Sequence, residues 1–502
     1  MTEDLDTERK LSEIMDRDVS TDLRSALGSL HMLPEGEQET PPQAIKLGNE
    51  ERVAIHERYR AIEQAILARA PEHKVQPSLE RVRMALGILG DPQTTYRSVH
   101  ITGTNGKTST ARMLSALLMA TGRKVGRYTS PHLHSMCERI SINDEPVTEA
   151  QFNALFDDVA PYLDMVDEAN ERVGKPRMSF FEILTVIALA GFADIPVDAA
   201  VVEVGMGGTW DATNVLDAEV AVIAPIAHDH EKWLGSTLRQ IAAEKAGIVK
   251  PGSVAIVAHQ EPEVMEILEQ RAREVDAQLR VEGRDFEVAQ RRLAVGGQML
   301  TVRTPAAVYA DVFVPLVGAH QAQNAALALA AMEAFNGGRA LEGALVEEGF
   351  ASATSPGRLE VVRTSPSIVV DAAHNPHGAR ALATALGESF DYTHMVGVYA
   401  AMADKNVEAV LSEMEPILDS IVITGMDTPR AMPAQDLGEV AVDVFGPDRV
   451  SVQHSLLDAI DQAVEQADAS TDPAASNGVV VFGSVVLVGH VRDLMKEQNQ
   501  RL

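Results

Sequence analysis

The chain of 502 residues is strongly acidic, with 43 Lys and Arg against 73 Asp and Glu and a formal net charge of −30 at pH 7. This charge disfavours binding to nucleic acid or to anionic membranes, because both need a basic surface. The one cysteine, Cys137, excludes an intrachain disulfide and any multi-cysteine metal site. The length predicts more than one domain, since single hydrophobic cores rarely grow beyond about 250–300 residues.

The amino-terminal segment does not resemble a signal peptide and lacks strong periodicity, although a short helix over about residues 11–30 is an alternative to disorder. Residues 1–40 hold eleven Asp and Glu against four Lys and Arg, and residues 31–43 are rich in Pro and Glu. We therefore expect residues 1–48 to form a disordered acidic tail. The longest apolar stretch, residues 183–193, is too short to span a bilayer, so we expect a cytoplasmic protein.

Two amphipathic patterns, over residues 51–70 and 79–89, then predict helices. The chain next alternates apolar runs with helical patterns, which predicts a mostly parallel sheet covered by helices. Strands are expected at 98–101, 199–204, 220–227 and 253–258, and helices at 108–121, 182–192 and 319–335. A second cycle follows residues 355–357, with strands at 367–371, 395–398, 421–424 and 479–482 and a helix at 378–386. The sequence thus predicts an α/β protein with domains over 49–354 and 355–502.

The strongest chemical signal is the segment ITGTNGKTS, residues 101–109, which follows a predicted strand and opens a predicted helix. Its glycines allow the backbone N–H groups to turn toward phosphate oxygens, and the helix N-terminus adds positive charge. Lys107 can contact the terminal phosphates of a nucleotide, and the Thr108 hydroxyl can ligate Mg²⁺. The spacing is shorter than in the common GxxxxGK[ST] loop, because residue 101 is Ile.

Glu203 ends the apolar strand of the segment VVEVGMGG, where an unpaired carboxylate is unfavourable. It is either a metal ligand beside the phosphates or a carboxylate capped by the amides of the Gly loop. His228, Asp229 and His230 follow another strand and suggest a metal or substrate position, although a single His is more often structural. Lys245 lies on a predicted helix with no further signal.

The second predicted domain begins near two charged residues that could contact a bound nucleotide. Asp371 ends a predicted strand and could accept a hydrogen bond from a ribose hydroxyl. Arg358 lies in the preceding linker, from which it could reach phosphates across a cleft or remain a surface charge. Charges supplied by a second domain suit an enzyme that closes on its substrate.

Together these motifs resemble the folylpolyglutamate synthase/dihydrofolate synthase branch of the Mur ligase superfamily. The matching segments lie between about residues 50 and 490: GTNGKTS at 103–109, YTSPHL at 128–133, ERISIN at 138–143, SFFE at 179–182, EVGMGGTWDATN at 203–214, HDHEKWLG at 228–235, EKAGI at 244–248, GAHQAQNAALALAA at 318–331, PGRLE at 356–360 and DAAHNPHG at 371–378. The resemblance implies a P-loop ATPase domain followed by a smaller Rossmann-like domain, with ATP bound between them.

The resemblance also implies a set of site residues. Nucleotide contacts fall on Asn105, Gly106, Lys107, Thr108, Asn324, Arg358, Asp371 and His374. Metal ligands fall on Thr108, Ser130, Glu203, His230 and Lys245, with Lys245 carbamylated and two Mg²⁺ sites, and a monovalent cation is compatible. Pterin-binding positions fall on Pro77, Ser78, Leu79, Ser179, Trp210 and Ala212. Lys107, His230 and Lys245 are the residues we expect to matter most for catalysis.

The implied reaction joins L-glutamate to dihydropteroate, to the γ-carboxylate of reduced folates, or to both, through an acyl phosphate. Two positions depart from the family pattern: Thr108 stands where folate enzymes usually have Gly, and Thr209-Trp210 where many have Arg-Leu. Trp210 could instead stack on the aromatic rings of the substrate. The alternatives are a cell-wall Mur-type amino-acid ligase and a noncatalytic nucleotide-binding switch. We expect a monomer that binds neither nucleic acid nor membranes.

Overall fold

The computed structural model describes residues 48–71, 78–469 and 476–501. The expected acidic tail lies outside the described residues except for residue 48, and so does Pro77. The two helices expected before the phosphate loop are present as α3 (Asn49–Leu67) and α4 (Glu80–Ile88). Their buried side chains, among them Tyr59, Ile62 and Leu86, belong to a core shared with α6 and α7.

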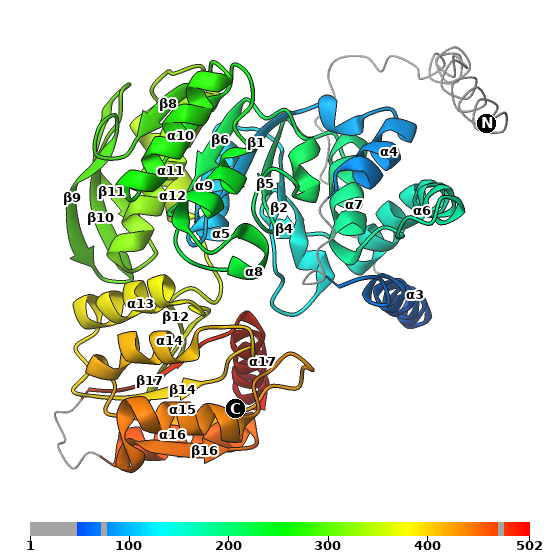
Figure 1. The fold of residues 1–502 in the computed structure, drawn as a ribbon. Coiled ribbons are helices and arrows are strands. Elements are labelled where there is room, and N and C mark those ends of the chain that lie inside the picture. Colours follow the sequence, from blue (N-terminus) through cyan, green and yellow to red (C-terminus); the bar gives the residue numbers. More distant parts are fainter. Residues whose placement is uncertain (1–47, 72–77, 470–475, 502) are drawn as a thin grey trace. The chain divides into compact units, whose positions relative to one another are not determined.

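The first region after α4 is built on an eight-stranded sheet (Figure 1). Its strands are β1 (Arg97–Thr102), β2 (Val125–Tyr128), β3 (Ile140–Ile142), β4 (Glu145–Pro146), β5 (Ala199–Glu203), β6 (Val220–Ile223), β7 (Val254–Val257) and β8 (Gln278–Val281). The order is β4-β3-β2-β5-β1-β6-β7-β8, and all pairs from β2 to β8 are parallel. The central strand β1 therefore ends beside β5 and β6, so the loops after these three strands lie together at the carboxyl ends of the parallel strands.

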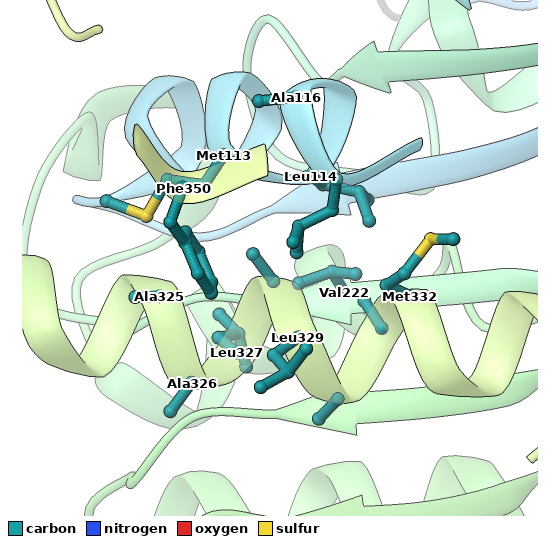
Figure 2. Close-up of a cluster of buried hydrophobic side chains, with 14 of the residues drawn as sticks. Met113, Leu114, Ala116, Val222, Ala325, Ala326, Leu327, Leu329, Met332 and Phe350 are labelled. Carbon is teal, nitrogen blue, oxygen red and sulfur yellow. The ribbon is translucent and has the colours of Figure 1, made fainter. Parts of the chain in front are cut away.

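Helices cover both faces of this sheet, because alternate strand residues are apolar on each side. The helices of this region are α5 (Lys107–Ala120), α6 (Glu149–Arg172), α7 (Phe180–Asp194), α8 (Glu231–Leu234), α9 (Leu238–Ala246), α10 (Pro262–Glu274), α11 (Ala319–Phe335) and α12 (Gly343–Ala351). Figure 2 shows one face, where Leu114 of α5 and Leu329 and Met332 of α11 lie around Val222, and Met113 of α5 lies beside Phe350 of α12. The other face packs against α7, α9 and α10.

A separate antiparallel sheet of three strands was not expected from the sequence. It contains β9 (Glu287–Ala294), β10 (Gly297–Arg303) and β11 (Val308–Val314), in the order β11-β10-β9. Its apolar side chains Leu300, Val302 and Val312 join the core around α11. None of the β9 side chains is fully buried, so the sequence shows little of the apolar signal that reveals a core strand.

The carboxyl-terminal region is built on a six-stranded sheet with helices on both faces. Its elements are β12 (Glu360–Thr364), β13 (Ser367–Asp371), α13 (Pro376–Ser389), β14 (His394–Tyr399), α14 (Val407–Met414), β15 (Ser420–Thr424), α15 (Ala434–Phe445), β16 (Val450–Gln453), α16 (Leu456–Asp468), β17 (Asn477–Phe482) and α17 (Val485–Arg501). The order is β12-β13-β17-β14-β15-β16, with only β12 antiparallel to its neighbour. The prediction of an α/β protein with mostly parallel sheets is confirmed. In the described ranges no helix is long and apolar enough to cross a membrane.

Candidate active site

A cavity of about 1310 Å³ opens where the strands of the eight-stranded sheet end, and residues of the carboxyl-terminal region complete its wall. Almost every predicted site residue lines it: Ser78, Asn105, Gly106, Lys107, Thr108, Ser130, Ser179, Glu203, Trp210, Ala212, His230, Lys245, Asn324, Arg358, Asp371 and His374. Leu79, the N-cap residue of α4, is not part of the lining. The structure thus gathers residues that lie up to about 300 positions apart in the chain.

The phosphate loop connects β1 to α5. Gly106 caps α5 with a φ of 88°, and a side chain there would place its Cβ only 2.5 Å from Asn324 Oδ1. Glycine is therefore required both by the backbone conformation and by the approach of α11. The Asn324 side chain, from α11, is held by its Nδ2 donating to Gln321 Oε1 at 3.1 Å.

Two lysines, the partly buried Lys107 and the buried Lys245, converge on one carbonyl oxygen of this loop. Lys107 Nζ donates to Gly103 O and Thr104 O, both at 3.2 Å, and Lys245 Nζ donates to Gly103 O at 2.8 Å. Burial lowers the pKa of Lys107. Burial, reinforced by the charge of Lys107, lowers the pKa of Lys245 to about 7. Two amines thus lie where the phosphates of a nucleotide would bind, and about half of the Lys245 amine is neutral near pH 7.

Glu203, at the end of β5, is 1% exposed and faces the phosphate loop. Its carboxylate accepts from Thr108 Oγ1 at 3.0 and 3.1 Å and from Ser130 N at 3.4 Å. Burial raises its pKa. The predicted alternative, capping by amides of the Gly loop, is therefore not what the structure contains. Asp211 supports that loop instead, because its Oδ2 accepts from Met206 N at 2.9 Å.

The oxygens of Glu203 and Thr108 are the hard ligands that Mg²⁺ prefers, so these residues fit the ion. Within the described ranges, however, no group of three or more His, Cys, Asp or Glu side chains is close enough to hold a metal by itself. An Mg²⁺ ion bound here would need phosphate or water oxygens to complete its coordination. His230 lines the same cavity, and burial lowers its pKa to about 4.

The part of the cavity lined by aromatic rings lies beside the start of α7. Ser179 caps α7 in a reciprocal arrangement with Glu182, whose carboxylate also accepts from Arg81 Nε at 2.9 and 3.1 Å. Phe180 and Phe181 follow Ser179 in the wall of the cavity. Across the loop after β5, Trp210 N donates to Glu244 Oε1 at 3.2 Å. These contacts hold the backbone that carries the aromatic side chains.

Asp371 and Arg358 face the cavity from the carboxyl-terminal region. The Asp371 oxygens accept from Leu359 N at 2.8 Å and from Ala373 N at 2.7 Å. Asp371 therefore braces the turn that carries Arg358, and burial raises its pKa. Its contact with a ribose hydroxyl stays a prediction.

The sequence pointed to Asp229 within the HDH segment and, through the family resemblance, to His374 as a nucleotide contact, but it did not pair the two residues and did not point to Lys405. Asp229 pairs with Lys405 Nζ at 2.7 Å and His374 Nε2 at 3.4 Å, and accepts from Asn375 Nδ2 at 3.1 Å. Although burial acts in the opposite direction, the hydrogen bond from His374 and the nearby cations hold the pKa of Asp229 far below its usual range. The HDH segment marked the position of Asp229, whereas no pattern marked Lys405.

Comparisons with known proteins agree with this geometry. Residues 164–332 match the Mur ligase middle domain, and residues 357–485 match the Mur ligase glutamate ligase domain. The dihydrofolate synthase/folylpolyglutamate synthase of Mycobacterium tuberculosis is 46% identical over 458 residues, which cover 88% of this chain and 94% of that protein. The protein of the same name from Bacillus subtilis is 33% identical over 366 residues, covering 72% and 84%.

Solved structures extend the similarity to the fold. Mycobacterium tuberculosis folylpolyglutamate synthase complexed with ADP matches with a TM-score of 0.85 and 46% identity, covering 88% of this chain and 99% of that one. Escherichia coli FolC in complex with DHPP and ADP matches with a TM-score of 0.73 and 30% identity, covering 85% and 94%. The predicted family is confirmed, and the chain belongs to the folylpolyglutamate synthase/dihydrofolate synthase family of Mur ligases.

Proposed function

We propose that this protein is an ATP-dependent ligase that joins L-glutamate both to dihydropteroate and to the γ-carboxylate of reduced folates. The observation that carries the proposal is that one cavity holds a phosphate loop, the Glu203–Thr108 pair and a wall of aromatic rings. The names of the relatives include both activities, which supports a bifunctional enzyme.

The first step needs a carboxylate and the terminal phosphate of ATP at the same point. Lys107 and the N–H groups of the loop that opens α5 are placed to bind the phosphates. The acceptor carboxylate attacks the γ-phosphorus in line, which forms an acyl phosphate and releases ADP. Bound Mg²⁺ would neutralise phosphate charge, held by Glu203, Thr108, Ser130, His230 and a carbamylated Lys245.

The second step forms the amide. The amino group of L-glutamate attacks the acyl carbon, phosphate leaves with the bonding electron pair, and the amine loses a proton. The chain contributes mainly position and electrostatics, because a carboxylate is already a competent nucleophile. The aromatic surface of Phe180, Phe181 and Trp210 is suited to the flat rings of the acceptor, with Ser78, Ser179 and Ala212 beside it.

The remaining parts of the proposal concern setting and organisation. We propose an ATP-binding domain over 49–354 and a ligase domain over 355–502, acting as a monomer in the cytoplasm without nucleic-acid or membrane partners. Two Mg²⁺ sites are included, and a monovalent cation is compatible with the same site. Cys137 is buried and free, which is consistent with a reducing compartment.

The test offers the purified protein Mg-ATP and L-glutamate with dihydropteroate or with tetrahydrofolate, and measures product masses. Dihydrofolate from the first acceptor and glutamate-extended tetrahydrofolate from the second are expected. A single product would restrict the enzyme to one step. ADP release without either product would reject the proposed acceptors, and absence of ADP would favour a noncatalytic binder.

A further inference from the structure

Asn375 makes three side-chain hydrogen bonds between the two α/β regions. It precedes α13 in the carboxyl-terminal region and is 3% exposed. Asn105, in the phosphate loop, donates from Nδ2 to Asn375 Oδ1 at 3.0 Å and accepts at Oδ1 from Asn375 Nδ2 at 3.1 Å. The two carboxamides therefore form a reciprocal pair that links the phosphate loop to α13.

The remaining acceptor position and the remaining N–H donor of the Asn375 side chain also have partners. Its Oδ1 accepts from Gly378 N at 2.8 Å, which caps α13, and its Nδ2 donates to Asp229 Oδ2 at 3.1 Å. A carboxamide has two acceptor lone pairs and two N–H donors, and here all four have partners. The Gly378 N–H and the Asp229 carboxylate also fix which end of the amide is oxygen.

These contacts specify asparagine rather than a general polar residue. Serine could still cap α13, but its hydroxyl is too short to reach both Asn105 and Asp229. Aspartate could also cap the helix, but it has no N–H to donate, and its charge would lie against the Asp229 carboxylate. The Asn105 side chain is in turn directed at the carboxyl-terminal region, where its Nδ2 also lies 2.9 Å from His377 Nδ1.

We infer that Asn375 is a positioning residue for the phosphate loop. It acts through Asn105 and Asp229, so that the loop keeps its nucleotide-binding conformation only while α13 packs against it. The side chain of Asn105 then serves the contact between regions, while its backbone remains available to phosphate. The expected effect of Asn375 on turnover rests on the proposed function. The expected effect on ADP affinity requires only that the phosphate loop binds a nucleotide.

The test compares Asn375→Ser and Asn375→Asp with wild type, using ADP affinity by calorimetry and kcat for ligation. We expect Asn375→Ser to weaken ADP binding and lower kcat by about tenfold each, as two to three lost hydrogen bonds imply. The KM for the folate acceptor should stay near the wild-type value, because the ring-lined surface is not touched. Asn375→Asp should be more damaging than Asn375→Ser, although both retain the helix cap.

Two further variants separate positioning from stability. Ser455→Ala removes a helix cap from α16 in the same region, far from the cavity, and should lower thermal stability without changing kcat or ADP affinity. Asn105→Ala combined with Asn375→Ser should be no worse than the more severe single variant, because the pair acts as one unit. The inference would be overturned if the effects of the two single variants multiplied in the double variant. It would also be overturned if Asn375→Ser had the ADP affinity and kcat of the wild type. Normal ADP binding without ligation by the wild type would reject the proposed function instead.

Discussion

Replacing Lys245 by methionine should stabilise the ligand-free protein at pH 6 while abolishing ligase activity. The Lys245 side chain is 4% exposed, and burial together with Lys107 lowers its pKa from 10.5 to about 7. Between these two pH values the unfolded chain binds a proton that the folded protein does not. The free energy of unfolding of the wild type therefore rises with pH from about 7 to 10.5. Below pH 7 the buried Lys245 is charged, and it lowers the free energy of unfolding by the full amount.

The size of this effect follows from the difference between the two pKa values. At pH 6 the buried lysine costs about 5 kcal/mol, and at pH 9 about 2 kcal/mol, to order of magnitude. Methionine has a similar length and no charge, but it loses the hydrogen bond to Gly103 O, which contributes about 1 kcal/mol. The advantage of the variant over wild type should therefore shrink by about 3 kcal/mol between pH 6 and pH 9.

Urea unfolding of both proteins at the two pH values measures this change. The buffers should be free of CO₂, nucleotide and divalent metal, so that the lysine stays unmodified. Lys496→Met, at an exposed position of α17, serves as the control whose difference from wild type should not depend on pH. A Lys245→Met advantage that is constant from pH 6 to pH 9 would refute the lowered pKa, and full ligase activity in the variant would remove Lys245 from the reaction.

Three further substitutions test other parts of the site. Arg81→Met should destabilise the protein by about 3 kcal/mol in urea unfolding, because it leaves the Glu182 carboxylate buried without its partner; additional replacement of Glu182 by Leu should recover much of the loss. Glu203→Ala should lower kcat by at least about 100-fold in an ADP-release assay, with an unchanged circular dichroism spectrum, and a near-normal rate would exclude Glu203 from the site. Trp210→Ala should raise the KM for the folate acceptor about tenfold and leave that for ATP unchanged, whereas equal changes in both would argue against ring stacking.

The phosphate loop could be predicted because all of its signals are contiguous in the sequence. A strand, two glycines, Lys107 and Thr108 and the start of a helix fall within residues 97–120. Glu203 was also recognisable, since a carboxylate at the end of an apolar strand needs a partner. The antiparallel β9–β11 sheet was missed, and β9 shows one reason: none of its side chains is fully buried, so its alternation carries little apolar contrast.

Contacts between distant segments could not be predicted in this way. Asp229 and Lys405 are 176 positions apart, and their pairing depends on how the loop after β14 meets the loop after β6. The same is true of Lys245, whose helix pattern was compatible with an exposed side chain. Its burial follows from the loop after β5, which lies so close to α9 that a Cβ at Gly208 would be 2.7 Å from Glu244 O.

The central place of β1 affects how the protein emerges from the ribosome. β1 pairs only with β5 and β6, and β6 ends at Ile223, about 120 residues after β1 ends at Thr102. At synthesis rates of about 5–20 residues per second, roughly 6 to 24 s pass before both neighbours exist. Until β5 ends at Glu203, about 100 residues after Thr102, the β1 strand that carries the phosphate loop has no native strand partner. This interval is when a nascent chain of this topology most needs chaperone protection.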